Sequence, residues 1–116
     1  MALGKIWIYY CTDDSNRIVH TSYVLHSKFK FAFSKKNELE IGPCHTNKTF
    51  RNKGLYKNVV KRITSDEKFE GQSFFMIVEE NNFPSIRGIE SSGFKKFGCI
   101  KKTKFIKIYR IVDENS

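Results

Sequence analysis

The residues best suited to chemistry lie in a basic segment near the middle of the chain. Arg51, Lys53 and Gly54 stand directly before a stretch with helical periodicity. A helix N-terminus carries backbone N–H groups without partners and a positive dipole end, so this spacing predicts an anion-binding loop. Walker and dinucleotide-binding motifs are excluded, because GxxxxGK[ST] and GxGxxG are both absent. A basic turn before an amphipathic helix explains the same residues without a ligand.

A second cluster follows the most apolar run of the chain. Asn82 and Ser85 are residue types that cap helices, and Gly93-Phe94 is typical of a helix stop followed by a core aromatic residue. Taken singly, these residues need no functional explanation.

The elements that must position both clusters follow from periodicity. Gly54 precedes an amphipathic helix, and Gly42-Pro43 marks a break or bulge at the end of a strand. The order β-β-(β)-β-α-β-α-β predicts an α/β fold with a mixed sheet, in a single domain of residues 1–116. The predicted strands are 5–11, 17–25, an extended segment around 29–33, 38–41, 73–78 and 104–112, with helices from 55 and at 85–91.

Positive charge is the outstanding feature of the composition. Lys and Arg number 21 against 12 Asp and Glu, which leaves a net charge of +9 and indicates a polyanionic partner. Sixteen of these cations are lysine and five are arginine. Nucleic acid is the obvious candidate, but arginine is the residue that usually reads base edges, so composition alone does not choose the anion.

The cysteines and the apolar runs indicate a soluble, cytoplasmic protein. Cys11, Cys44 and Cys99 are odd in number and lack ligand spacing, so we expect neither a disulfide framework nor a metal site. The longest apolar run, 74–78, is far shorter than the about 20 residues that span a bilayer, and no signal peptide is recognisable.

In their order along the chain, these segments resemble the GCN5-related N-acetyltransferase family. Its first motif, R/Q-x-x-G-x-G/A, matches Arg51 to Tyr56, with Tyr56 in the last, usually small, position. Its second motif matches Asn82 to Ile86 and then Gly93-Phe94, including the spacing of eight from Ser85 to Gly93. The resemblance covers residues 38–97 well, and IGPCHTNKTFRNKGLY is similar to a bacterial subgroup associated with cell-surface polysaccharide synthesis.

The resemblance implies a mainly antiparallel sheet with splayed central strands and about two helices, and it implies acetyl-CoA as cosubstrate. The pyrophosphate would lie on the backbone amides of 51–56, the pantetheine arm beside 44–46, and Asn82 with Ser85 on the far side. The implied cofactor-binding residues are Cys44, His45, Thr46, Arg51, Asn52, Lys53, Gly54, Leu55, Tyr56, Asn82 and Ser85.

The resemblance also implies direct attack by an amine on the thioester, with a backbone N–H stabilising the oxyanion. Glu40 lies where family members often carry the catalytic base, and Glu38 shares its face; both also fit solvated strand carboxylates. His45 is an alternative base. Ile89 replaces the tyrosine that usually protonates the departing thiolate, which leaves water or the phenol of Tyr56 as the donor.

The acceptor stays open, because the strand and two helices that usually precede the hairpin and wall the acceptor site are missing here. An amine is expected, with an amino sugar or a sugar nucleotide among the candidates. Phe29, Phe31 and Phe33 fit an acceptor floor, ordinary core or a homodimer face, and Cys44 fits a small hydrophobe better than an acyl acceptor. Two other classes remain: a noncatalytic acyl-CoA-binding or interaction module on the same fold, and a basic nucleic-acid-binding domain.

Overall fold

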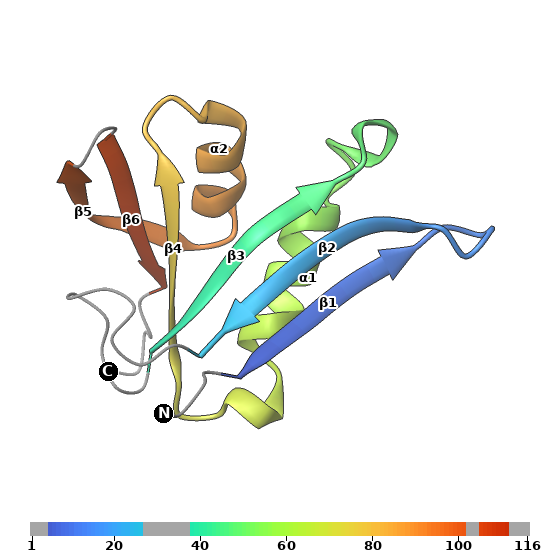
Figure 1. Ribbon diagram of the computed structural model, residues 1–116, viewed down its shortest axis with the longest axis horizontal. Coiled ribbons are helices and arrows are strands. Elements are labelled where there is room, and N and C mark those ends of the chain that lie inside the picture. Colours follow the sequence, from blue (N-terminus) through green and yellow to red (C-terminus); the bar gives the residue numbers. More distant parts are fainter. Residues whose placement is uncertain (1–4, 27–37, 102–104, 112–116) are drawn as a thin grey trace.

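The computed structural model describes residues 5–26, 38–101 and 105–111, which form a six-stranded sheet with two helices (Figure 1). The strand order is β1-β2-β3-β4-β6-β5, and β3 and β4 are parallel while all other neighbours are antiparallel. The predicted mixed, mainly antiparallel sheet is confirmed. The elements are β1 (Ile6–Thr12), β2 (Ile18–Leu25), β3 (Glu38–Thr46), η1 (Lys48–Phe50), α1 (Leu55–Thr64), η2 (Glu67–Phe69), β4 (Ser73–Glu79), α2 (Phe83–Ser91), β5 (Phe94–Lys101) and β6 (Phe105–Ile111).

The predicted hairpin of the first two strands is confirmed. The carboxylate of Asp13 accepts hydrogen bonds from the backbone N–H groups of Ser15 and Arg17, and Asn16 adopts a left-handed conformation with φ 61°. These are the properties that make Asp and Asn common in tight turns. No helix therefore lies between β1 and β2.

β3 carries the irregularity that was expected at Gly42-Pro43, but the strand does not stop there. Ser22 pairs with Cys44 and Val24 with Ile41, so β3 holds one residue more than β2 between these pairs and continues as a strand to Thr46. This bulge has a consequence for side-chain direction. Since paired residues share a face, Cys44 points to the same side of the sheet as Ile41.

The central strands splay, as expected from the resemblance. β3 pairs with β4 only over Glu38 to Glu40, opposite Ser73 to Phe75, and the two strands then diverge (Figure 1). Beyond Glu40, no strand among the described residues pairs with the edge of β3 that faces β4. A gap in a sheet at this point gives a ligand access to backbone N–H and C=O groups.

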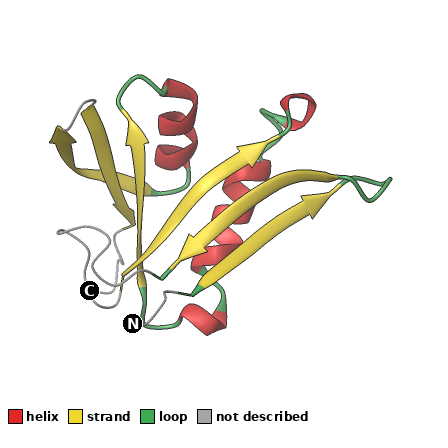
Figure 2. Cartoon of the chain, in the orientation of Figure 1, coloured by secondary structure: helices red, strands yellow, loops and turns green. Residues whose placement is uncertain are grey.

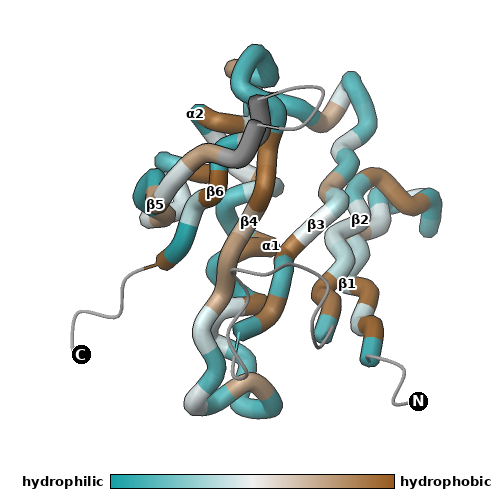
Figure 3. Tube along the Cα trace, turned by 60° about the vertical axis from the view of Figure 1, so that its left-hand side comes forward, coloured by the Kyte–Doolittle hydropathy of each residue, from teal (hydrophilic) through white to brown (hydrophobic). Residues whose placement is uncertain are grey.

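Both helices pack into one hydrophobic cluster on a single face of the sheet (Figure 2). The amphipathic helix α1 buries Val59, Val60 and Ile63, and α2 buries Ile86 and Ile89. The strands and Phe69 of η2 supply the rest of the cluster, and β4 is apolar along most of its length (Figure 3). The central strand members of the cluster are Leu39, Ile41, Phe74, Met76, Val78 and Tyr109.

One strand was not predicted. β5 pairs with β6 along its whole length, and the register shifts between Lys96 and Gly98. The bulge interrupts the alternation of apolar and polar residues that indicates a strand, and the lysines of β5 obscure this alternation further. The sequence therefore does not predict β5. Phe94 is the predicted core aromatic residue and is buried.

The extended segment predicted around Phe29, Phe31 and Phe33 lies outside the described residues. Among the residues that are described, no helix is long and apolar enough to cross a membrane. All three cysteines are free thiols.

Candidate functional site

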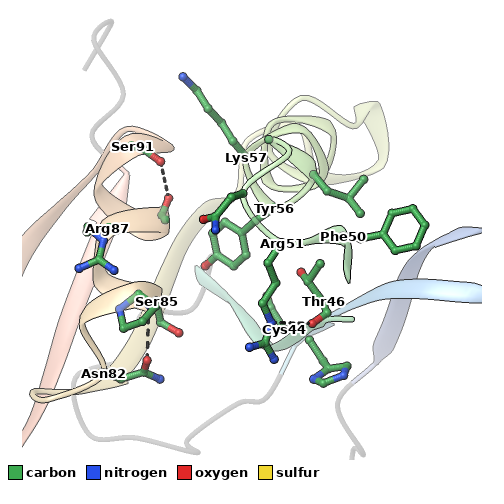
Figure 4. Close-up of a pocket in the computed structure, with 16 residues that line it drawn as sticks. Cys44, Thr46, Phe50, Arg51, Tyr56, Lys57, Asn82, Ser85, Arg87 and Ser91 are labelled. Carbon is green, nitrogen blue, oxygen red and sulfur yellow. Dashed lines mark hydrogen bonds between the residues drawn. The ribbon is translucent and has the colours of Figure 1, made fainter. Parts of the chain in front are cut away.

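A cavity of about 650 Å³ opens where β3 leaves β4, between the start of α1 and one face of α2 (Figure 4). Three segments line it: the end of β3, the loop with the first turn of α1, and α2. The lining residues are Cys44, His45, Thr46, Phe50, Arg51, Asn52, Gly54, Leu55, Tyr56, Lys57, Asn82, Pro84, Ser85, Arg87, Gly88 and Ser91.

All but one of the residues predicted to bind the cofactor line this cavity. The exception is Lys53, whose ammonium lies 5.2 Å from the centroid of the Phe50 ring. Arg51 donates from Nε to the backbone carbonyl of Thr46 at 3.1 Å, which folds its side chain back toward the end of β3. In Figure 4 the guanidinium of Arg51 lies between the two walls of the cavity.

The loop before α1 exposes backbone donors. Asn52 and Gly54 both have positive φ, at 63° and 76°, and Gly54 is the N-cap residue without a capping side chain. The first intrahelical bond runs from the N–H of Asn58 to the carbonyl of Gly54, so the N–H groups ahead of it have no partner within the helix. No acidic residue lies in the first turn. This end of α1 is therefore suited to an anion.

The wall formed by α2 was only partly predicted. Ser85, Gly88 and Ser91 follow at intervals of three and share one side of the helix, a spacing that could have identified this wall. A Cβ on Gly88 would lie 3.1 Å from Cδ1 of Tyr56, so the glycine lets the Tyr56 ring lie against α2. Asn82 caps α2 by accepting a hydrogen bond from the Ser85 N–H at 3.4 Å, as the structural interpretation expected.

The cavity carries positive charge. Arg51, Lys57 and Arg87 are among its lining residues, and none of the described residues that line it is a carboxylate. In Figure 4, Lys57 and Arg87 extend away from the centre, which places their charges at the rim. The sequence analysis did not assign Lys57 or Arg87 to the site.

Behind the cavity lies a group of buried polar side chains that the sequence analysis missed. His20 and Ser22, on β2, are 1% and 0% exposed. The His20 ring nitrogens lie 2.6 Å from Oγ1 of Thr46 and 2.7 Å from Oγ of Ser22. Ser22 pairs with Cys44 across β2 and β3, and the ring of Tyr56 lies edge-on to the His20 ring, with 6.3 Å between the ring centroids. The sequence did carry a signal for this group. His20 and Ser22 occupy the alternate positions before Val24, on the buried face of a strand, where apolar residues are usual.

Burial keeps this group uncharged near neutral pH. Desolvation, with the positive potential of His45, lowers the pKa of His20. Desolvation raises the pKa of Cys44, and it raises the pKa of Tyr56 together with the neighbouring Cys44. The imidazole is therefore neutral, and the thiol and the phenol keep their protons.

Neither carboxylate of β3 is solvated, so that expectation is wrong. Glu38 and Glu40 are 4% and 7% exposed, and they point to the face opposite Leu39 and Ile41, away from the helices. Glu38 is committed to a buried ion pair with Arg110. Glu40 pairs with Phe75 at the last rung before β3 and β4 separate, which places it beside the gap but outside the cavity lining.

Comparison with known proteins gives consistent findings. A family model described as FR47-like protein matches residues 32–106. A mutant of the spermidine N-acetyltransferase SpeG from Vibrio cholerae has a similar structure, with a TM-score of 0.74 and 12% identity over 92% of this chain and 65% of that one. An IAA acetyltransferase from Bacillus cereus gives a TM-score of 0.71 and 12% identity over 90% of this chain and 75% of that one. No curated protein sequence matches the chain.

Proposed function

The chain belongs to the FR47-like family of GCN5-related N-acetyltransferases, and on that premise we propose that it transfers an acetyl group from acetyl-CoA to an amine. The observation that carries the proposal is the cationic cavity of about 650 Å³ at the start of α1, where β3 and β4 separate. Coenzyme A has an anionic end that needs donors and a thin arm that needs a slot, and this cavity offers both. The chain covers 65% of the length of the spermidine N-acetyltransferase structure, so its acceptor is also part of the proposal.

The phosphates of acetyl-CoA would bind at the N-terminus of α1. The N–H groups of Leu55 and Tyr56 supply the donors, and Arg51 supplies formal charge within the cavity. Lys57 and Arg87 supply charge at the rim. Lys53 is not a cavity residue, and its contribution is limited to the general positive field.

The pantetheine arm would lie in the slot between the end of β3 and α2. The pantetheine arm carries its amides along an extended chain, like a strand. β4 does not pair with the edge of β3 from Cys44 to Thr46, so the backbone groups of that edge can hydrogen-bond these amides. Ser85 and Asn82 lie on the opposite wall. The thioester then points toward the place where the strands separate.

Glu40 is the proposed base. It lies at the last paired position of β3 and β4, on the face away from the helices, so an acceptor entering from that face would meet it beside the thioester. The acceptor amine must lose a proton as it attacks, and a carboxylate at the gap takes that proton directly or through one water. Glu38 is set aside because its carboxylate is held by Arg110. His45 remains the alternative base, since it lines the cavity.

The proposed acceptor is a small amine, with a polyamine, an amino sugar or a sugar nucleotide as the classes to screen. The one competing function that a specific observation favours is an acyl-CoA binder without catalysis. Ile89 stands where the resemblance places a proton donor, and its side chain is buried in the core at 2% exposure.

Thermal melting tests the proposal at its first step. Acetyl-CoA at ~100 times its dissociation constant should add ~2.7 kcal/mol of stability, which raises the melting temperature by several degrees. If acetyl-CoA does not raise the melting temperature, both the acetyltransferase and the noncatalytic acyl-CoA binder are excluded. If the shift is present, release of free thiol from acetyl-CoA in the presence of spermidine or glucosamine identifies the enzyme, and binding without release identifies the binder.

A further inference from the structure

Arg51 places its positive charge inside the cavity, and the direction of its side chain depends on the last residue of β3. Its Nε donates to the backbone carbonyl of Thr46 at 3.1 Å, and Figure 4 shows the side chain running toward the end of that strand. The N–H donors of a guanidinium lie in one rigid plane, so a bond at Nε fixes where the others point. The Thr46 carbonyl therefore decides where the cavity presents this charge.

The peptide group between Thr46 and Asn47 is held by β2. Its N–H, on Asn47, donates to the carbonyl of Val19 at 2.8 Å. In a trans peptide the N–H and the C=O lie in one plane and point in opposite directions. Because this N–H points toward β2, the Thr46 carbonyl points toward the edge of β3 that faces the cavity, where Arg51 binds it.

A second contact to Thr46 comes from His20, the residue after Val19. His20 pairs with Thr46 across β2 and β3, and its Nδ1 lies 2.6 Å from Oγ1 of Thr46. On the other side of the ring, Nε2 lies 2.7 Å from Oγ of Ser22. With a partner at both nitrogens, the ring does not turn without losing a hydrogen bond. The imidazole therefore gives the Thr46 side chain a fixed place.

This arrangement explains why a strand buries two polar residues where apolar ones would fit. His20 and Ser22 are 1% and 0% exposed, and burying polar groups costs free energy that their hydrogen bonds only partly return. β3 ends at Thr46, and the ends of strands open more readily than their centres. A buried side chain that binds the last residue of the strand opposes such opening at the edge of the cavity.

We propose that His20 is a positioning residue for Arg51, holding the end of β3 so that the Thr46 carbonyl directs the guanidinium toward the phosphates of acetyl-CoA. The inference rests on the proposed binding of acetyl-CoA, and it adds to that site a residue that does not line the cavity. An arginine that is already oriented loses less conformational entropy when the ligand binds. His20 thereby raises the affinity for the anionic end of the cofactor and takes no part in the chemical step.

A double-mutant cycle between His20 and Arg51 tests this role. His20→Gln brings an amide near the position of Nε2 and leaves Thr46 without the imidazole, and Arg51→Gln removes the guanidinium. Calorimetric titration with acetyl-CoA should give a Kd roughly tenfold weaker for His20→Gln, and at least as weak for Arg51→Gln. The double variant should bind as weakly as Arg51→Gln alone, because His20 acts only through that side chain.

Cys11→Ala is the matched control. Cys11 pairs with His20 across β1 and β2, but it does not line the cavity, and it contacts neither Thr46 nor Arg51 in the pairing of the strands. Its Kd for acetyl-CoA should equal that of the wild type. If His20→Gln does not fold, Thr46→Val takes its place in the cycle, since it removes the hydroxyl that meets the ring and keeps the branched shape of the side chain.

Two further measurements separate positioning from a general defect of the fold. In His20→Gln the KM for acetyl-CoA should rise while kcat stays at the wild-type value, because Arg51 meets the phosphates and not the reacting atoms. Thiol release with spermidine or glucosamine measures both constants. By NMR, the Nε–H of Arg51 should be protected from hydrogen exchange in the wild type without ligand, and it should lose this protection in His20→Gln.

Each outcome decides the proposal. A wild-type Kd in His20→Gln or in Arg51→Gln overturns the positioning role and leaves acetyl-CoA binding standing. Additive losses in the double variant overturn it as well, because His20 then acts by another route. If the wild type binds acetyl-CoA but releases no thiol, the transferase is excluded and the cycle, which measures binding alone, still decides the role of His20. A wild type without affinity for acetyl-CoA overturns the proposed function and this inference with it.

Discussion

Arg110 on β6 donates two hydrogen bonds to the carboxylate of Glu38 on β3, from Nε at 2.6 Å and from Nη2 at 2.9 Å. The two residues lie on either side of β4, with side-chain exposures of 12% and 1%. This bidentate pair ties the two halves of the splayed sheet together at the point where the strands are still joined. Glu38 therefore has a structural role, and Glu40 lies two residues further along β3, at the last position that pairs with β4.

Replacing Arg110 with methionine should destabilise the fold strongly. The substitution keeps the volume of the side chain but leaves the buried Glu38 without its cation, which typically costs about 3–5 kcal/mol. Urea unfolding measures the loss. Arg17→Met is the matched control, because the Arg17 side chain is 77% exposed where it pairs with Asp13, and it should leave stability unchanged. If the two substitutions lower the stability equally, the buried ion pair contributes no more to stability than the exposed pair of Arg17 and Asp13.

Glu40→Gln should reduce turnover without weakening acetyl-CoA. The amide has the same shape but takes no proton, and loss of a general base typically lowers kcat by roughly 10²–10⁴-fold. Thiol release with the amine that supports turnover measures the rate, and the melting shift measures binding. Glu79→Gln, at the exposed end of β4, is the control. Undiminished turnover in Glu40→Gln would transfer the role of base to His45.

Gly54→Asp should abolish the melting shift with acetyl-CoA. An aspartate at this position places a carboxylate at the N-terminus of α1, where it repels phosphate and occupies the free N–H groups. Gly71→Asp separates this effect from backbone strain. Gly71 has a similar positive φ, 82° against 76°, and both positions have open space around an added Cβ, but Gly71 does not line the cavity. A melting shift retained by Gly54→Asp would refute the phosphate assignment.

The buried His20 should make the fold less stable in mild acid. Its pKa is lowered in the folded state, so the unfolded chain binds more protons once the pH falls below about 6.5, the ordinary value. Stability is therefore full above that pH and is lost progressively as the pH falls toward the lowered pKa. Melting temperatures across this window measure the loss.

A variant separates His20 from the other histidines. His20→Gln should flatten the dependence, whereas His26→Gln should leave it as in the wild type. Asp13 and Asp66, whose pKa values are lowered by hydrogen bonds from Arg17 and Tyr9 respectively, titrate at more acidic pH and do not enter this window. A curve for His20→Gln that matches the wild type would mean that another group carries the pH dependence.

Much of the fold was predictable because it is encoded by neighbours in the chain. Asp13 and Asn16 make their own turn, Gly54 starts α1, and the spacing of Val59 and Ile63 sets the buried side of that helix. β5 escaped prediction because its bulge near Gly98 interrupts the alternation on which strands are recognised.

The sequence by itself determined the loop, the helix starts and the order of motifs that identify the family, since each depends on residues a few positions apart. Only the tertiary structure decided which of these side chains meet. His20 and Thr46 are 26 positions apart, and they touch because β2 and β3 pair in one register. The extra residue at the bulge then turns Cys44 to the side of Ser22, and Tyr56 arrives from α1 with its ring centroid 6.3 Å from that of His20. Register and bulge position depend on how whole strands pack, so no local pattern specifies them.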